Sequence, residues 1–572
     1  SSDRTGQPFA WTSSGADASR LSDAQKNALK QTASTTSSNL TKGRARVDYV
    51  RGDRSNEGSS GQKFRVRTHL LGDIVNSDPL FVGQQDFGYD LLPGTEGSSY
   101  LTFRTSAGYT GRTPMVYVGA NDGMLHGFDV STANGGTERL AYIPLPAYVN
   151  LWQLSDPNYS HKFFVDGSTA FGDAYIAGAW KTILVGALGG GGRGVFALDI
   201  TDPASFSASD VLWEKVNIAD GASWSPKMNI VDDSDIGYTY GQASVVRMQN
   251  GKWAAVFGNG YNSNGHDAVL FIVDLEDGST IKKINAANGT ATTPNGLSSP
   301  IPVDIDNDRI VDAIYAGDMR GNLWKFDVSG NGAGSWGVAF GGTPLFVATA
   351  PDGTRQPITA RPEVTKHPVS GVVVLFGTGK YFEERDRRLQ DTEQTQTFYG
   401  IYDQGGAVSS RAALLEQDLI EEIASDDPRN PSSGTDNPVD VRVTTEQTPT
   451  VAQKGWYFDL PTTGERQVSR PIVRDRRVIY TTVIPNDSAC FAGGTSWLME
   501  MDSVTGSRLP FSPFDLNNDQ QIDGDDYVEI TTGDGQLVRV PVSGKKSDEG
   551  VIKTPGIVGA GDLEYKYTSG TT

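Results

Sequence analysis

The chain has 572 residues, 67 of them glycine, and a formal net charge of −20 at pH 7. This length allows one large repeat domain or several domains with substantial cores. The negative charge argues against nucleic acid as a partner, because phosphates would be repelled, and it fits a soluble surface that tolerates cations. Cys490 is the single cysteine, so an intramolecular disulfide is excluded.

Targeting signals do not decide the location of the chain. No apolar run reaches the length of a membrane span, and no signal peptide is visible. The sequence opens on the polar residues SSDRTGQ, which suggests a piece of a longer protein.

Residues 1–68 form a polar N-terminal extension. We expect one helix near residues 23–33 and a flexible Gly/Ser-rich link at residues 58–61. Arg51, Gly52 and Asp53 form an integrin-recognition tripeptide in a stretch that we expect to be exposed. The alternative is a chance occurrence, because such a tripeptide is not rare in a chain of this length.

A repeat runs through residues 69–572. Each copy has an apolar strand that ends in glycine or threonine and, after a gap, a second apolar strand that ends in aspartate. The copies are VYVG (116–119) with LHGFD (125–129), ILVG (183–186) with VFALD (195–199), AVFG (255–258) with LFIVD (270–274), IYAG (314–317) with LWKFD (323–327), VLFG (374–377) with FYGIYD (398–403), and VIYT (478–481) with WLMEMD (497–502).

A further short strand precedes each copy. These strands are SDPLFV (77–82), STAF (168–171), QASVV (242–246), SPIPV (299–303), ARPEV (360–364) and SRPIV (469–473). Several short antiparallel strands per period, repeated six or seven times, predict an all-β fold, a β-propeller with helical and loop insertions. The strand at residues 535–542 would complete a seventh blade, and an array of β-sandwiches is the alternative.

The glycine run at residues 189–194 resembles a phosphate-binding loop only superficially, because a strand follows it and not a helix. We expect a flexible turn. The five histidines are scattered singly and show no metal-ligand spacing, and no histidine lies beside Cys490 in the sequence.

The most informative motif is the nonapeptide DIDNDRIVD at residues 304–312. Its carboxylates stand at positions 1, 3, 5 and 9 (Asp304, Asp306, Asp308 and Asp312), and Ile310 at position 7 offers a backbone carbonyl. Hard oxygen ligands in this number suit Ca²⁺. A solvated acidic turn is the alternative. Arg309 replaces the glycine of EF-hand position 6 and Tyr315 the glutamate of position 12, so we expect a hairpin loop between strands.

An insertion interrupts the repeat at residues 404–455. We expect an amphipathic helix over residues 411–423, because Leu415, Leu419 and Ile423 would share one face. Most such stripes pack on their own domain, and binding of a partner is the alternative.

A second acidic loop covers residues 515–526 and is close to a dockerin-type EF loop. Its predicted calcium ligands are Asp515, Asn517, Asp519, the Gln521 carbonyl, Asp523 and Asp526. An acidic surface loop is the alternative, since position 6 is Gln520 and not glycine.

Four segments carry a resemblance to a known family: GDIVNSDP (72–79), DIGYTYG (235–241), VFGNGYN (256–262) and YAGDMRGNLWKFD (315–327). From about residue 45 onward the chain resembles the C-terminal domain of the PilY/PilC family, which are large type IV pilus biogenesis factors and tip-associated adhesins. The resemblance implies a modified seven-bladed propeller with one Ca²⁺, bound here by Asp304, Asp306, Asp308, the Ile310 carbonyl and Asp312.

Further expectations follow from this resemblance. Calcium occupancy would govern pilus extension against retraction, and with it twitching motility and attachment. The expected partners are type IV pilus components (minor pilins of the tip complex) and a host-cell receptor, with an integrin proposed for Arg51, Gly52 and Asp53. The expected location is the cell surface, at the pilus tip and outer membrane, reached through the periplasm. The family's von Willebrand A-like N-terminal half lies outside this sequence.

Three functional hypotheses remain open at this point. The leading one is a non-enzymatic, calcium-gated pilus regulator and adhesin. In the second, calcium is purely structural and the propeller is an adhesion scaffold. In the third, the chain is a quinoprotein-like dehydrogenase. Against this third hypothesis, such enzymes commonly stack a vicinal disulfide on the quinone, and one cysteine cannot form it.

Overall fold

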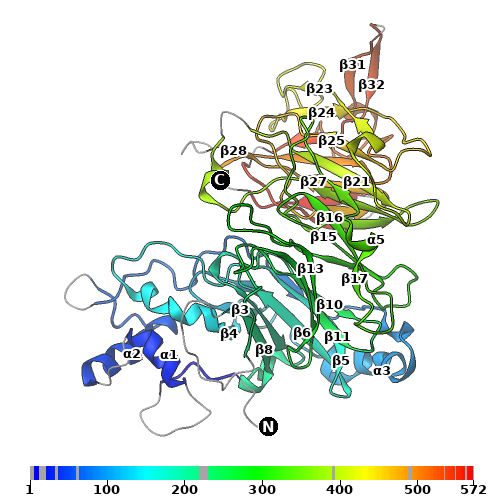
Figure 1. Cartoon of the computed structure of the whole chain (residues 1–572). Coiled ribbons are helices and arrows are strands. Elements are labelled where there is room, and N and C mark those ends of the chain that lie inside the picture. Colours follow the sequence, from blue (N-terminus) through cyan, green and yellow to red (C-terminus); the bar gives the residue numbers. More distant parts are fainter. Residues whose placement is uncertain are drawn as a thin grey trace. The chain divides into compact units, whose positions relative to one another are not determined.

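The structure is a computed structural model that describes residues 6–11, 21–31, 36–58, 63–217, 230–389, 393–486, 493–533, 535–547, 549–560 and 563–570. Residues 59–61 of the predicted link, and Cys490, lie outside the described residues. The chain divides into two compact units, shown in Figure 1. The first comprises Ser1–Ile314 and Asp327–Gly337, and the second comprises Tyr315–Phe326 and Val338–Thr572.

Three sheets of the first unit are antiparallel meanders that follow chain order, except that β9 lies parallel to β8. Their strands are β1 (Leu80–Val82), β2 (Met115–Gly119), β3 (Leu125–Asp129) and β4 (Glu138–Tyr142); β5 (Thr169–Ile176), β6 (Ala179–Ala187), β7 (Gly194–Asp199), β8 (Val211–Val216) and β9 (Ile230–Asp232); and β10 (Ser244–Arg247), β11 (Trp253–Gly258), β12 (Ala268–Asp274) and β13 (Thr280–Ala287).

These sheets pack face to face in succession. One core cluster joins Tyr117 of β2 to Leu184 of β6. A second cluster joins Val185 of β6 to Phe257 of β11. Every residue of β12 is buried, because a middle strand of a blade is covered on both faces by its neighbours.

The chain passes between the units within its next group of strands. These are β14 (Ile301–Val303), β15 (Ala313–Gly317), β16 (Asn322–Asp327) and β17 (Gly337–Val338). In the second unit, β18 (Phe346–Val347) pairs with β16.

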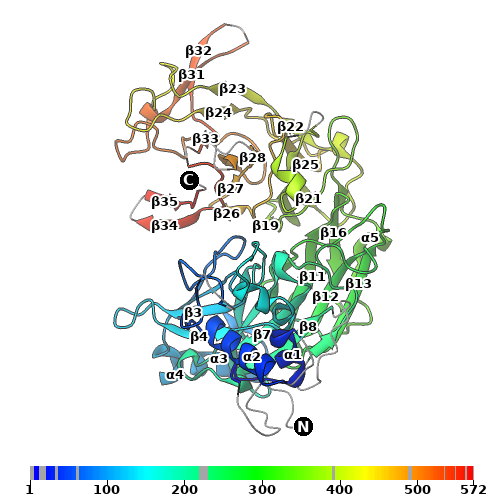
Figure 2. The same cartoon turned by 90° about the vertical axis from the view of Figure 1, so that its left-hand side faces the viewer.

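Two larger sheets form the second unit, shown in Figure 2. One has the order β19 (Glu363–Lys366), β20 (Val372–Gly377), β21 (Thr397–Asp403), β25 (Gly455–Asp459), β22 (Leu415–Gln417). The other has the order β23 (Leu419–Ile423), β24 (Val441–Thr444), β33 (Gly544–Lys546), β30 (Trp497–Asp502), β27 (Arg477–Thr481), β26 (Ile472–Arg474). Phe398 of β21 stacks on Tyr480 of β27, with ring centroids 3.9 Å apart, so these sheets also share a core.

Three two-stranded hairpins complete the strands of the second unit. They are β28 (Ile484–Pro485) with β29 (Gly494–Thr495), β31 (Val528–Thr531) with β32 (Leu537–Val540), and β34 (Gly556–Ala560) with β35 (Leu563–Tyr567).

The helices are short and stand outside the sheets. The α-helices are α1 (Asp23–Lys30), α2 (Ser37–Val50), α3 (Gly94–Thr105), α4 (Ala107–Thr110) and α5 (Ala339–Gly342). The 3₁₀ turns are η1 (Tyr89–Leu91), η2 (Leu145–Val149), η3 (Leu151–Ser155), η4 (Gly189–Gly191), η5 (Pro203–Ser205), η6 (Ala208–Asp210), η7 (Glu384–Arg387), η8 (Arg411–Ala413) and η9 (Gly524–Asp526). Within the described residues no helix is both long and apolar enough to span a membrane.

The sequence predictions for strands and for the first helix are largely confirmed. All six repeat copies are strand pairs, and each has its preceding short strand. The helix near residue 23 is α1, which begins with a capping box between Ser22 and Gln25, whereas α2 was not predicted. The propeller fold is confirmed by the family and structural matches given below, while its seven-blade count and the boundary at residue 68 stay predictions.

Two predictions were wrong. Residues 411–423 are not a helix: η8 is followed by β22, which pairs parallel with β25, and by β23, which pairs antiparallel with β24. The strand at residues 535–542 does not complete a blade, because β32 pairs with β31 in a separate hairpin. The tight turn that contains Gly535, with a φ of 83°, folds this segment back on itself.

Candidate metal centre

The nonapeptide forms a loop between β14 and β15, as the spacing predicts. A backbone hydrogen bond from the Asp312 N–H to the Val303 carbonyl, 3.0 Å long, closes its base. Buried strand residues on both sides, such as Ile301 and Ala313, anchor the two ends. The acidic side chains therefore stand on a short loop that two strands hold in place.

Asp304 organises the backbone of the loop. Its Oδ1 accepts hydrogen bonds from the backbone N–H groups of Asn307 (2.6 Å) and Asp308 (3.2 Å), and its Oδ2 accepts one from Arg309 (2.8 Å). Asn307 and Arg309 have positive φ values of 66° and 72°. This left-handed backbone curls the chain around the Asp304 carboxylate.

Three of the four predicted carboxylates converge. One oxygen each from Asp304, Asp306 and Asp312 lies within 4.8 Å of the others, and no second such group of three acidic, histidine or cysteine side chains occurs among the described residues. Asp308 instead accepts a hydrogen bond from the Ile310 N–H at 2.8 Å. The donor set fits Ca²⁺, which takes carboxylate and carbonyl oxygens in irregular geometry. Asp308 and the Ile310 carbonyl stay predicted ligands.

The loop concentrates negative charge. Burial, and then the neighbouring carboxylates of Asp306, Asp304 and Asp312, raise the pKa of Asp308 above its ordinary value. Like charges this close disfavour the ionised state unless a cation or water separates them. A bound divalent cation would relieve this repulsion.

The second acidic loop has the same backbone signature. Its fourth and sixth residues, Asn518 and Gln520, have positive φ values of 61° and 67°. The Gln520 N–H donates to Asp515 at 2.9 Å, as Arg309 does to Asp304. Asp526 is 0% exposed and accepts from the Leu516 N–H at 2.7 Å. Asp526 thus takes the closing place that Asp312 has in the first loop.

The first loop makes contacts that no local pattern indicates. The Arg309 side chain donates to the Gly88 carbonyl at 3.3 Å, and Gln249 donates to Asp312 at 3.2 Å. These partners lie far from the loop in the sequence, and only the fold brings them together.

Comparisons with known proteins decide the family. The model of the PilY1 β-propeller domain matches residues 71–427. The chain belongs to the PilY1 family. It is 40% identical over 486 residues to a type IV pilus biogenesis factor PilY1 homologue of Xylella fastidiosa, covering 80% of this chain and 31% of that protein. It is 39% identical over 519 residues to PilY1 of Pseudomonas aeruginosa strain PAK, covering 84% of this chain and 42% of that protein.

A solved structure agrees with this assignment. The crystal structure of the Pseudomonas aeruginosa PilY1 C-terminal domain superposes with a TM-score of 0.69 at 32% identity, covering 87% of this chain and 98% of that domain. The chain spans about a third to two fifths of the length of the PilY1 relatives named above. Its membership of the PilY1 family fixes the fold, while the activity of a whole PilY1-type protein stays a proposal for this chain.

The Arg-Gly-Asp tripeptide of this PilY1-family chain follows α2 directly. Arg51 and Asp53 are exposed, and Gly52 has a φ of 104°. The Arg51 side chain donates to the Phe9 carbonyl at 3.1 Å, and the Asp53 carboxylate accepts the Ser55 N–H at 2.6 Å. This hydrogen bond from Ser55 lowers the pKa of Asp53. The tripeptide is thus a surface turn with both charged side chains tethered.

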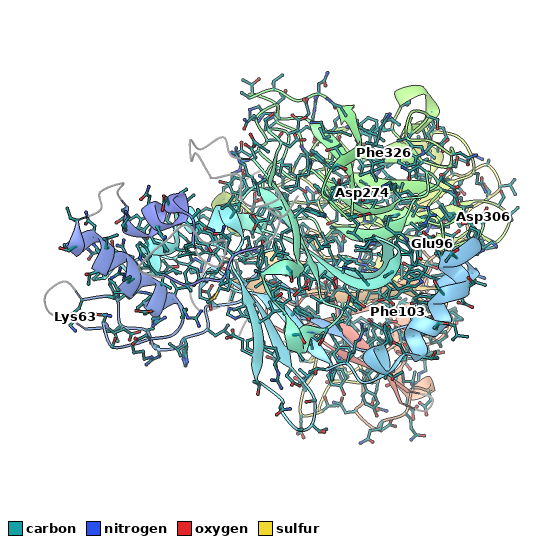
Figure 3. All side chains as sticks on the ribbon, turned by 90° about the horizontal axis from the view of Figure 1, so that it is seen from below. Lys63, Glu96, Phe103, Asp274, Asp306 and Phe326 are labelled. Atoms are coloured by element: carbon teal, nitrogen blue, oxygen red, sulfur yellow. The ribbon has the colours of Figure 1, made fainter. Side chains whose placement is uncertain are left out.

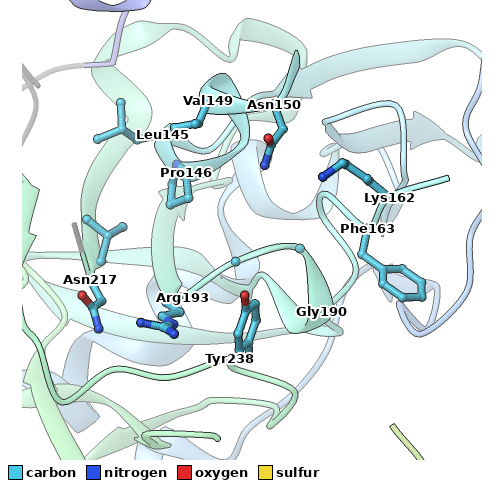
Figure 4. A pocket seen from close by; sticks show the side chains of 13 residues that line it. Leu145, Pro146, Val149, Asn150, Lys162, Phe163, Gly190, Arg193, Asn217 and Tyr238 are labelled. Atoms are coloured by element: carbon cyan, nitrogen blue, oxygen red, sulfur yellow. The ribbon is translucent and has the colours of Figure 1, made fainter. Parts of the chain in front are cut away.

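A pocket of about 360 Å³ in the first unit is lined by hydrogen-bond donors and apolar side chains. The polar ends of Asn150, Lys162 and Tyr238 point into it (Figure 4). None of its thirteen lining residues is Asp, Glu, His or Cys. Lys162 and Tyr238 are the side chains of this wall that could act as a general acid or base.

Proposed function

We propose that this chain is the calcium-responsive propeller domain of a type IV pilus biogenesis factor and tip adhesin. Its calcium ligands would be Asp304, Asp306, Asp308, the Ile310 carbonyl and Asp312, and occupancy would favour pilus extension over retraction. The supporting observation is the convergence of three carboxylates in one loop of a PilY1-family propeller. The proposed location is the pilus tip and outer membrane, and the proposed partners are minor pilins of the tip complex.

The residues of the loop would act as an electrostatic switch. When bound, Ca²⁺ would neutralise part of the carboxylate charge and would be coordinated by oxygen atoms of several loop residues at once. Without it, Asp304, Asp306 and Asp312 repel one another, and the loop is held by hydrogen bonds alone. Ion binding would therefore shift a local equilibrium between a loose and an ordered loop.

Calcium titration tests this proposal. Isothermal titration calorimetry on the wild-type chain should show a calcium-binding event at residues 304–312 that Asp312→Ala weakens about a hundredfold or more. In cells, the variants Asp312→Ala and Asp312→Lys would be scored for pilus number and twitching. Asp312→Lys should mimic occupancy, because its ammonium group would sit among the remaining acids, and Asp312→Ala should resemble the empty site. Identical pilus phenotypes for the two variants would rule out the electrostatic switch.

Purely structural calcium is the competing function, with the propeller as an adhesion scaffold. The loop is compatible with it, since a bound ion stabilises whichever state holds it. Affinity distinguishes the two: a structural site holds calcium tightly, whereas a sensor exchanges it over the range in which its surroundings vary. A dissociation constant far below environmental calcium would favour the scaffold.

A second calcium site at residues 515–526 is part of the proposal. Supporting it, the buried Oδ1 of Asp515 has no hydrogen-bond partner, and the backbone follows the path of the first loop. The proposed ligands are Asp515, Asn517, Asp519, the Gln521 carbonyl, Asp523 and Asp526. Burial raises the pKa of Asp526, which a cation at the loop would reverse.

Host attachment through Arg51, Gly52 and Asp53 completes the proposal, with an integrin-type receptor as the partner. Its support is the exposure of both charged side chains on a turn. We propose no enzymatic activity, because the PilY1 relatives of this chain are named as pilus biogenesis factors.

A further inference from the structure

Arg309 occupies a backbone position that favours glycine. Its φ of 72° lies in the left-handed region, where the Cβ atom of a side chain crowds the following carbonyl oxygen. EF-hand loops place glycine at the equivalent sixth position for this reason. An arginine retained in a strained conformation points to a use for its side chain.

The side chain of Arg309 reaches a helical insertion of the same unit. Its Nε donates to the carbonyl of Gly88 at 3.3 Å. A Cβ atom on Gly88 would lie 3.0 Å from the Arg309 Nη2, so a side chain there would crowd the guanidinium. Gly88 is the N-cap of η1, which leads directly into α3.

The neighbouring loop residue packs toward the same insertion. Ile310 is half-buried against a core cluster that Phe87, Tyr89 and Phe103 also contact. Phe87 stacks on Tyr89 with centroids 5.6 Å apart, and Tyr89 meets Tyr100 of α3 edge-on at 5.4 Å. The loop, η1 and α3 therefore all pack against one core cluster.

A second connection runs through Arg247 at the end of β10. Its backbone carbonyl accepts the N–H of Val311 at 3.0 Å, next to the predicted ligand Asp312. Its side-chain Nε donates to Glu96 of α3 at 2.7 Å, and both side chains are largely buried. Figure 3 labels Glu96 and Phe103 on α3 and Asp306 in the loop.

We propose that Arg309 is a positioning residue that couples cation binding at the loop to the order of residues 86–105. The inference rests on the proposed calcium site. Asp304 holds the Arg309 N–H at 2.8 Å and is itself a predicted ligand, so an ion drawn to Asp304 fixes the peptide that aims the guanidinium at Gly88. Repulsion in the empty loop loosens this peptide, and the insertion loses a contact. The order of α3 then depends on whether a cation is bound in the loop.

Hydrogen exchange with and without calcium tests the coupling on the full chain. In the wild type, calcium should slow exchange about tenfold in peptides from residues 304–312 and from residues 86–105. Arg309→Gly removes the side chain and the backbone strain together. It should bind calcium at least as tightly by calorimetry and protect residues 304–312, yet lose most of the calcium-dependent protection of residues 86–105, since the link through Arg247 and Glu96 would remain.

Arg54→Ala is the matched control, because it removes an exposed arginine that donates to the Thr68 carbonyl. It should keep the wild-type exchange pattern. Protection of residues 86–105 that persists in full in Arg309→Gly, or that is absent from a calcium-loaded wild type, overturns the coupling while leaving the calcium site intact. A wild type that shows no calcium heat overturns the proposed function itself, so the two failures are distinguishable.

Discussion

Asp312 holds the opposite end of its own loop: its Oδ2 accepts a hydrogen bond from the backbone N–H of Ile305 at 2.8 Å. Its Oδ1 accepts a further hydrogen bond from the side chain of Gln249 at 3.2 Å. The ninth residue is therefore both a predicted ligand and the clasp that closes the turn. Loss of charge and loss of the clasp are separable by choice of substitution.

Asp312→Asn and Asp312→Ala separate these two roles. The amide of Asn keeps an acceptor oxygen for Ile305 but removes the charge, so calcium affinity should fall, roughly tenfold, with the apo stability unchanged. Alanine removes both, and affinity should fall about a hundredfold or more together with a lower melting temperature without calcium. Calorimetry and thermal melts with and without calcium measure these effects. Equal affinities for the two variants would show that the charge, and not the clasp, dominates.

The second loop should bind independently of the first. Asp515→Ala removes the buried, unpartnered oxygen and the acceptor for the Gln520 N–H. We expect it to abolish one of two calcium binding events and to leave the event that Asp312→Ala removes. Calorimetric stoichiometry of the two single variants and of the double variant measures this. A wild type with a single binding event that Asp515→Ala leaves intact would assign residues 515–526 to an ordinary acidic surface loop.

Asp53 provides the exposed carboxylate of the Arg-Gly-Asp tripeptide. Asp53→Ala should reduce binding of the chain to integrin-bearing cells, because the carboxylate is the anionic half of the tripeptide. Asp53→Glu keeps the charge but moves it by one methylene, and in an integrin-type site it should also fail. Cell-attachment counts for both variants, with calcium binding as the folding control, measure the effect. Wild-type attachment by Asp53→Ala would mark the tripeptide as a chance occurrence.

The repeat was predictable from sequence because its signals are local. Five of the six first strands end in glycine, and at two of them a neighbouring backbone passes: a Cβ atom on Gly119 would lie 2.3 Å from the Val165 carbonyl, and one on Gly258 would lie 2.1 Å from that of Ser298. Close backbone approach admits no side chain, so glycine recurs with the fold. The acidic residues of 304–312 are also close together in the sequence, so the candidate metal-binding loop could be recognised without knowing the fold.

The segment at residues 411–423 shows where sequence reasoning failed. Leu415, Leu419 and Ile423 are four residues apart, a spacing that fits one helix face and also one strand face. The buried Gln417 between them, whose amide donates to the carbonyls of Gln447 and Thr505, decides for the strand. Pairing with β25 and β24 overrode a strong helix propensity, as tertiary context often does.

Glu214 predicts a pH dependence of stability. It is 1% exposed in β8, and burial raises its pKa from 4.5 to about 7, although the Tyr142 hydroxyl and the Leu145 N–H donate to it. Between these two pKa values the folded state holds a proton on Glu214 that the unfolded state has released. The stabilisation from this protonation is therefore fully present below pH 4.5 and is lost as the pH rises through 7.

The variant Glu214→Gln removes the titration. The free energy of unfolding of the wild type, relative to this variant, should fall by about 3 kcal/mol between pH 4.5 and pH 8. Urea titrations across this range measure it. Glu276→Gln, at an exposed position, is the control and should show no such trend. A pH-independent difference for Glu214→Gln would mean that the carboxylate stays ionised in the folded state.

Arg442 and Glu465 form a fully buried ion pair in the second unit. Both side chains are 0% exposed, with N–O distances of 2.7 and 2.9 Å. The Thr482 hydroxyl also donates to Glu465, and the guanidinium lies 3.8 Å from the ring centroid of Trp497. Glu465→Ala leaves a buried cation whose remaining ion pair is with the half-exposed Glu422, and it should lower the free energy of unfolding by about 3–5 kcal/mol.

A double variant tests whether charge or packing dominates. Arg442→Met with Glu465→Leu removes both charges and keeps apolar volume, and it should recover most of the loss, because a buried ion pair and its apolar replacement are often equally stable. Glu384→Ala breaks an exposed pair with Arg387 and should cost less than about 1 kcal/mol. Urea midpoints followed by far-ultraviolet circular dichroism measure all three. If the double variant is as unstable as Glu465→Ala, the contacts of the pair with Thr482 and Trp497, and not its charge balance, stabilise this part of the unit.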